Sequence, residues 1–146
     1  MIRRSILAGV VALAVAGCGS ASPTMARLRA KATRVCTRAS ARGTRIAPPP
    51  VPAQSGAFLH RGIAVLRPEL ASLRTLHAPS EQAGAYSAAL GSLARELAIL
   101  TATARDLDRG ADPLTTIKTL QHRLAPVEAN GDAAWRTLGV PACVNR

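Results

Sequence analysis

Aromatic residues are almost absent from this chain of 146 residues, which has one Trp, one Tyr and one Phe. Proteins that hold single-stranded nucleic acid stack its bases on aromatic side chains, so the shortage argues against that class despite a formal net charge of +11. The sequence also lacks stretches that alternate apolar and polar residues with many β-branched side chains, which is the pattern of a half-buried strand. We therefore expect an all-α fold whose core is built mainly from Leu and Ala.

The sequence has one long apolar run, and it lies at the N-terminus. Two arginines in "MIRR" precede "SILAGVVALAVAG", which ends at Cys18. The run is shorter than the roughly 20 apolar residues that span a membrane, and a short apolar run behind positive residues is typical of an export signal. The end of this run together with the cysteine, "VAGC" from Val15 to Cys18, resembles the bacterial lipobox.

The lipobox resemblance implies a diacylglycerol on Cys18, cleavage before that residue and acylation of the new amine. It divides the chain into a lipoprotein signal peptide (1–17), a lipidated tether (18–23) and a helical bundle domain (24–146). The expected location is the cell membrane, on its extracytoplasmic face, with the lipid as the membrane partner. The alternative is an ordinary signal peptide with a chance cysteine.

Positive charge gathers just beyond this segment. Removal of Arg3 and Arg4 with the signal peptide lowers the net charge to +9, and no acidic residue lies between positions 24 and 45. That interval holds seven cations: Arg27, Arg29, Lys31, Arg34, Arg38, Arg42 and Arg45. Beside a lipid anchor they would face anionic lipid or wall polymer, where each cation contributes about 1 kcal/mol. Nucleic acid is not an expected partner of an exported chain, and a merely solvated basic face is the alternative.

Two cysteines, Cys36 and Cys143, remain once Cys18 carries lipid. In an exported protein such a pair indicates a disulfide rather than a redox or metal centre. The bridge would close a loop of roughly a hundred residues and stabilise the fold by about 4–5 kcal/mol in the chain-entropy model. Two free thiols are the alternative.

Apolar residues recur at helical spacing through the rest of the chain, and we expect helices at 24–42, 56–77, 80–109 and 112–138. The clearest seam advances by four and three residues in turn, which suits left-handed bundle packing: Tyr86, Leu90, Leu93, Leu97, Leu100, Ala104 and Leu107. Ser80 is the expected N-cap of the third helix and Asp112 that of the fourth, and Gly110 suits a helix end. Pro68 and Pro126 should kink or split their helices.

These elements predict a four-helix up-down bundle with a proline-rich linker, residues 43–56, after the first helix. In that topology the start of the first helix and the end of the fourth share one pole, so Cys143 can fold back near Cys36. The ending "LGVPACVNR", Leu138 to Arg146, together with Cys36 and an Ala/Arg-rich composition, resembles small actinobacterial envelope lipoproteins. The resemblance implies the same cellular location and the same kind of fold.

Candidate chemistry is scarce. The histidines His60, His77 and His122 do not form a zinc motif, and solvent-facing histidines are expected. An EF-hand reading of Asp106, Asp108 and Asp112 fails because Ala111 and Ile117 stand where Gly and Glu are required. The glutamates, Glu69, Glu81, Glu96 and Glu128, have spacings that suit solvated helix faces. We expect no metal, no cofactor and no catalytic residues.

The sequence therefore predicts a lipid-anchored helical bundle at the cell envelope that is a non-catalytic binding or adaptor module. A protein of the envelope would be its partner. The alternative is a carrier that holds a small hydrophobic ligand or lipid in a cavity of the bundle.

Overall fold

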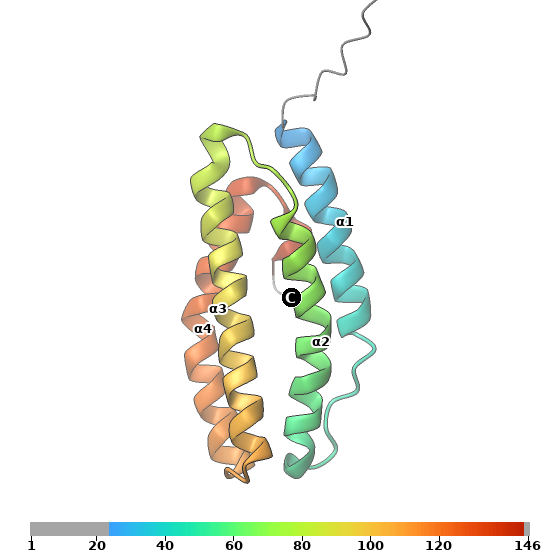
Figure 1. Cartoon of the computed structure of the whole chain (residues 1–146), viewed down its shortest axis with the longest axis vertical. Helices are drawn as coiled ribbons and strands as arrows, with labels where there is room; N and C mark the ends of the chain where they lie inside the picture. The colour runs from blue at the N-terminus through green and yellow to red at the C-terminus, as the bar shows by residue number, and fades with distance from the viewer. Residues whose placement is uncertain (1–23, 145–146) are drawn as a thin grey trace, which may run out of the picture.

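A computed structural model describes residues 24–144 of the chain and shows an all-α bundle of four helices, as predicted (Figure 1). The helices are α1 (Met25–Gly43), α2 (Ser55–Arg74), α3 (Ala83–Asp108) and α4 (Pro113–Leu138), and they alternate in direction. Single 3-10 turns form η1 (Pro52–Gln54), η2 (Ser80–Gln82) and η3 (Pro141–Cys143). The predicted signal peptide, Cys18 and the tether lie outside the described residues.

The structure confirms two of the three predicted helix-end signals, Asp112 and Gly110. The Asp112 side chain accepts a hydrogen bond from the Thr115 amide at 2.9 Å, which caps α4. Gly110 and Gly139 take positive φ angles of 88° and 67° just beyond α3 and α4, a conformation that favours glycine. The prediction for Ser80 was wrong. Its hydroxyl donates to the Glu81 carboxylate and η2 intervenes, so α3 begins only at Ala83.

Neither internal proline splits its helix. Pro68 lies within α2 and Pro126 within α4, and both helices continue through them as single elements. A proline removes the hydrogen bond to the carbonyl four residues earlier, which belongs to Ala64 and His122 here. All four residues are exposed, so water can satisfy the freed carbonyls.

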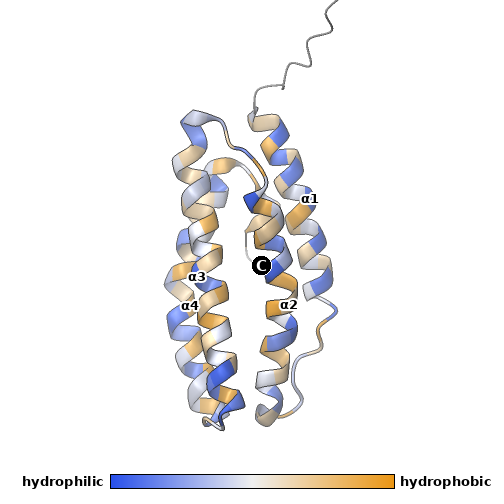
Figure 2. Ribbon diagram, viewed as in Figure 1, coloured by the Kyte–Doolittle hydropathy of each residue, from blue (hydrophilic) through white to orange (hydrophobic). Residues whose placement is uncertain are grey.

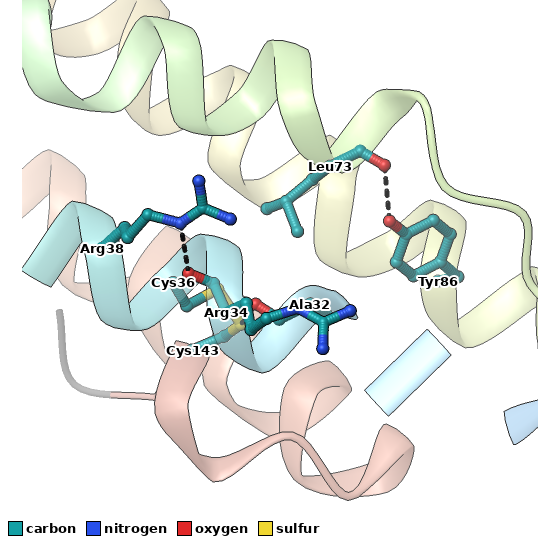
Figure 3. Close-up of a disulfide and its surroundings, with 7 residues drawn as sticks. All are labelled: Ala32, Arg34, Cys36, Arg38, Leu73, Tyr86 and Cys143. Atoms are coloured by element: carbon teal, nitrogen blue, oxygen red, sulfur yellow. Dashed lines mark hydrogen bonds between the residues drawn. A yellow bond between two sulfur atoms is a disulfide. The ribbon is translucent and has the colours of Figure 1, made fainter. Parts of the chain in front are cut away.

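The larger hydrophobic cluster lies in the half of the bundle that is uppermost in Figure 1, and all four helices contribute to it. Its centre is the fully buried Trp135, whose ring packs edge-on against Tyr86 with centroids 6.0 Å apart. The Tyr86 hydroxyl donates to the carbonyl oxygen of Leu73 at 2.6 Å, which ties α3 to the end of α2 (Figure 3). The remaining buried residues are mainly Leu and Ala, as expected.

The lower half is a three-helix arrangement, because α1 stops well above the level at which α2 and α4 begin and α3 ends (Figure 1). Leu59, Ile63, Ala104 and Leu120 form a second, smaller cluster there. The proline-rich linker runs down to the start of α2, and η1 contacts α4. An extended linker thus takes the place that further turns of α1 would occupy.

The most extensive backbone contact between two helices joins α3 and α4. Gly131 of α4 is buried, and a Cβ atom built there would lie 3.2 Å from the Ser92 Cβ of α3. The absence of a side chain at Gly131 therefore allows the two backbones to approach.

Candidate anionic-surface site

Five of the predicted surface cations form a single row along α1. Arg27, Lys31, Arg34, Arg38 and Arg42 recur at intervals of four, three, four and four residues, so they fall within about 80° of the helix surface. All five are exposed, and Arg45 lies just beyond the helix end. Figure 2 shows hydrophilic positions that recur from turn to turn along α1. We call these five residues and Arg45 the α1 cation row.

Arg29, the seventh predicted cation, lies apart from this row. Its Nε donates to the carbonyl oxygen of Leu138 at 2.8 Å, and its guanidinium covers Gly139. The side chain therefore satisfies one of the carbonyls that the end of α4 leaves unpaired.

Charge is distributed unevenly over the chain. All eight acidic residues lie at Glu69 or later in the sequence. Three ion pairs formed between described residues join partners on α2, α3 and α4 or at their ends. Lys31, Arg38 and Arg42 have no carboxylate within 4 Å among residues 24–144. The side of the molecule that α1 covers is therefore strongly positive.

A groove of about 320 Å³ lies between α1 and α2. One wall carries Lys31, Arg38 and Arg42 of the cation row, and the other wall is formed by polar and apolar residues of α2. Arg38 donates from Nε to the Arg34 carbonyl oxygen at 3.3 Å, which holds its guanidinium against the helix (Figure 3). Arg38 and Arg42, which are one helical turn apart, and Lys31, two turns before Arg38, thus lie along the same side of the groove.

Sequence reasoning missed this groove and the burial of Glu69, which was assigned to a solvated face. Glu69 lines the groove but is only 1 % exposed, and it has an interaction partner within the chain. Its position three residues after Leu66 and four before Leu73, within the apolar stripe of α2, is the signal that could have revealed its burial.

The structure joins Cys36 and Cys143 by a disulfide, with their Cα atoms 5.2 Å apart (Figure 3). Both cysteines are fully buried. The bond holds η3 against α1 and so fixes α1 to the end of the chain as well as to α2. The cation row therefore lies on a helix that is held in place from two sides.

Four of the six residues considered for metal binding have other partners, and the remaining two, His77 and His122, are exposed. His60 contacts the Asp108 carboxylate at 2.9 Å, Asp106 pairs with Arg109 at 3.6 Å and Asp112 caps α4. The hydrogen bond from the Thr115 amide lowers the pKa of Asp112 below its usual value. The described part of the chain contains no group of three or more His, Cys, Asp and Glu side chains placed to hold a metal ion.

Two further pockets lie at the lower end of the bundle. One, of about 510 Å³, lies between α3 and α4 and is lined by threonines, Asp106, Arg109 and Arg123. The other, of about 330 Å³, is lined by prolines of the linker, Val51, Leu114 and Ile117 among others. Both are open to solvent.

Fold and site define a class: a disulfide-closed four-helix bundle with a cationic flank on its first helix. No protein-family model matches the chain, and neither a curated protein nor a solved structure matches it. Within residues 24–144, no helix combines the length and the hydropathy of a membrane-spanning segment.

Proposed function

We propose that this chain is a lipid-anchored protein of the extracytoplasmic face of the cell membrane that works as a non-catalytic binding or adaptor module. Lipid on Cys18 holds the protein at the membrane, and the α1 cation row binds anionic lipid or wall polymer. The exposed faces of the other helices are then available to a protein partner of the envelope. The observation that carries this proposal is the cation row.

Distance supports a role for the row beside an anchor. Only five residues separate Cys18 from Thr24, the N-cap of α1, and the six residue steps between them span at most about 20 Å. The diacylglycerol and the acylated amine proposed for Cys18 would anchor the chain stably, since two or more acyl chains hold a protein at a membrane far better than one. The cations, which contribute about 1 kcal/mol each near an anionic surface, would then orient the bundle against that surface.

The anchor is tested in a bacterial host with lipoprotein maturation, by labelling with an alkyne fatty acid followed by membrane fractionation. We expect the wild-type chain to carry the label and to sediment with membranes, and Cys18→Ser to lose both properties. The double variant Cys36→Ala/Cys143→Ala is the matched control and should keep the label. Equal labelling of wild type and Cys18→Ser would exclude the lipid anchor.

The cation row is tested by cosedimentation of the unlipidated mature chain, residues 19–146, with vesicles. We expect binding to anionic phosphatidylglycerol vesicles, little binding to phosphatidylcholine, and release by salt, which screens exposed charges. Replacement of Arg34, Arg38 and Arg42 by Gln should weaken binding more than tenfold, since each contributes about 1 kcal/mol. The control variant replaces Arg105, Lys118 and Arg123 by Gln, which lowers the net charge by the same amount as the first triple replacement. Equal losses in both triple variants would reject the cation row as the binding surface.

The ligand-carrier hypothesis stays a prediction. The linker pocket, with its prolines, Val51 and Leu114, is the apolar candidate among the pockets described above. Native-state mass spectrometry of the protein extracted from membranes would detect a bound small molecule.

A further inference from the structure

We propose that the groove between α1 and α2 is a discrete site for the phosphodiester headgroup of an anionic membrane lipid. This inference rests on the proposed function, because it assigns the anionic-surface binding to one place on the cation row. Its consequence is that the bundle lies on its side at the membrane, with the α1–α2 flank toward the lipid.

The donors of the groove suit a phosphodiester. The hydroxyls of Ser72 and Thr75 donate to carbonyl oxygens of their own helix, at 2.8 Å each. The ammonium of Lys31 and the guanidinium groups of Arg38 and Arg42 are therefore the donors left for a ligand. Guanidinium pairs offer bidentate hydrogen bonds to phosphate oxygens, and charge assistance makes such bonds roughly twice as strong as neutral ones.

Preorganisation distinguishes the groove from the rest of the row. Arg38 is held by its hydrogen bond to the Arg34 carbonyl oxygen, so less side-chain freedom is lost when it binds. Arg34 and Arg45 are exposed and do not line the groove. Glu69 also lines the groove but is almost without exposure, so the three exposed cations carry most of the charge at the surface that a headgroup meets.

The direction of the row determines the orientation. Lys31 and Arg42 lie about 16 Å apart along α1 at 1.5 Å per residue. If the helix pole at Thr24 pointed at the membrane, Arg42 would lie about 27 Å farther away, well beyond the roughly 10 Å over which exposed charges interact at 0.1 M salt. Only a bundle on its side brings all three cations to the headgroups, and the tether after Cys18 is long enough for that position.

The chain contains two lysines, which supply a probe and an internal reference. Lys31 lines the groove in the second turn of α1, whereas Lys118 is exposed in the second turn of α4, near the opposite end of the bundle. The experiment measures the rate at which an amine-reactive ester modifies each lysine, by mass spectrometry, in the full lipidated protein on vesicles. We expect Lys31 to react at least fivefold more slowly on phosphatidylglycerol than on phosphatidylcholine, and Lys118 to react equally on both.

Two matched variants separate a site from diffuse charge. Arg38→Gln/Arg42→Gln should restore the Lys31 rate seen on phosphatidylcholine, whereas Arg34→Gln/Arg45→Gln, with the same charge change, should keep most of the protection. Circular dichroism and the disulfide mass check the fold of both variants. Equal effects of the two pairs would overturn the groove while leaving anionic-surface binding intact.

Further outcomes test the proposed orientation, the proposed function and the source of the phosphodiester. If Lys118 is protected as strongly as Lys31, or Lys31 is not protected, the proposed orientation is wrong. If, in addition, the unlipidated chain does not bind anionic vesicles, the proposed function fails as well. Soluble poly(glycerol phosphate) added without vesicles distinguishes the source of the phosphodiester: protection of Lys31 equal to that on vesicles would assign the groove to wall polymer and overturn the lipid.

Discussion

Arg29 of α1 donates a hydrogen bond from Nε to the carbonyl oxygen of Leu138, the last residue of α4, over 2.8 Å. The contact joins residues 109 positions apart in the sequence. It gives one exposed arginine of the basic segment a partner at the end of α4.

The first prediction separates these two roles. Arg29→Met should lower the free energy of unfolding by about 1–3 kcal/mol, because a partly buried carbonyl loses a charged donor. Arg34→Met, at an exposed position of the cation row, should change stability by less than about 0.5 kcal/mol. Urea denaturation followed by circular dichroism measures both. Equal stability of the two variants would show that the Arg29–Leu138 hydrogen bond contributes nothing.

The burial of Tyr86 predicts that the free energy of unfolding decreases at alkaline pH. Burial raises the pKa of Tyr86 to about 12, above the value near 10 of an unfolded tyrosine. The folded state thus binds this proton more tightly, so its contribution to stability is complete below pH 10 and is lost as the pH rises through about 12. Because Tyr86 is the one tyrosine of the chain, absorbance at 295 nm reports its titration alone. A midpoint near 10 in the folded protein would contradict the prediction, and Tyr86→Phe should remove this part of the pH dependence.

The disulfide predicts a stability difference and a protected bond. Cys36→Ala/Cys143→Ala should lower the free energy of unfolding by about 2–5 kcal/mol, since the bridge spans 107 residues and restricts the unfolded chain. Both sulfur atoms are buried, so a thiol reductant should act only as fast as the protein unfolds. The rate of reduction is followed by intact mass during exposure to a reductant, with and without denaturant. Rapid reduction under native conditions would mean that the bond is accessible.

The close contact between α3 and α4 predicts that replacing glycine by alanine changes stability differently at Gly62 and at Gly131. Gly62→Ala in α2 meets open space and should stabilise the protein by up to about 1 kcal/mol, the difference in helix propensity. Gly131→Ala should give no gain or a loss, because its Cβ would crowd the Ser92 Cβ at 3.2 Å. In a Ser92→Gly background, Gly131→Ala should recover the gain, which a double-mutant cycle detects. An equal gain at both glycines in the wild-type background would reject the close approach.

Local sequence patterns were enough to predict the helices and most of their ends. The seam from Tyr86 to Leu107 lies in the two hydrophobic clusters as its spacing predicts, and Asp112 caps α4. Each of these features depends on residues within one or two turns, so the sequence around them carries the information. Ser80 shows the limit of such reasoning, because a neighbouring carboxylate takes the hydroxyl that should have capped the helix.

The sequence by itself also determined the composition of the core, the pairing of Cys36 with Cys143 and the concentration of cations in the first helix. Helical spacing separates Arg29 from the cation row, but only the tertiary structure decided that Arg29 meets the carbonyl oxygen of Leu138 and that Lys31, Arg38 and Arg42 of the row face α2. It also decided that Glu69 is buried and that a groove opens beside it. The physical reason is that these outcomes depend on which flank of α1 meets α2 and which meets the chain end, and helical spacing along one segment does not contain that relationship.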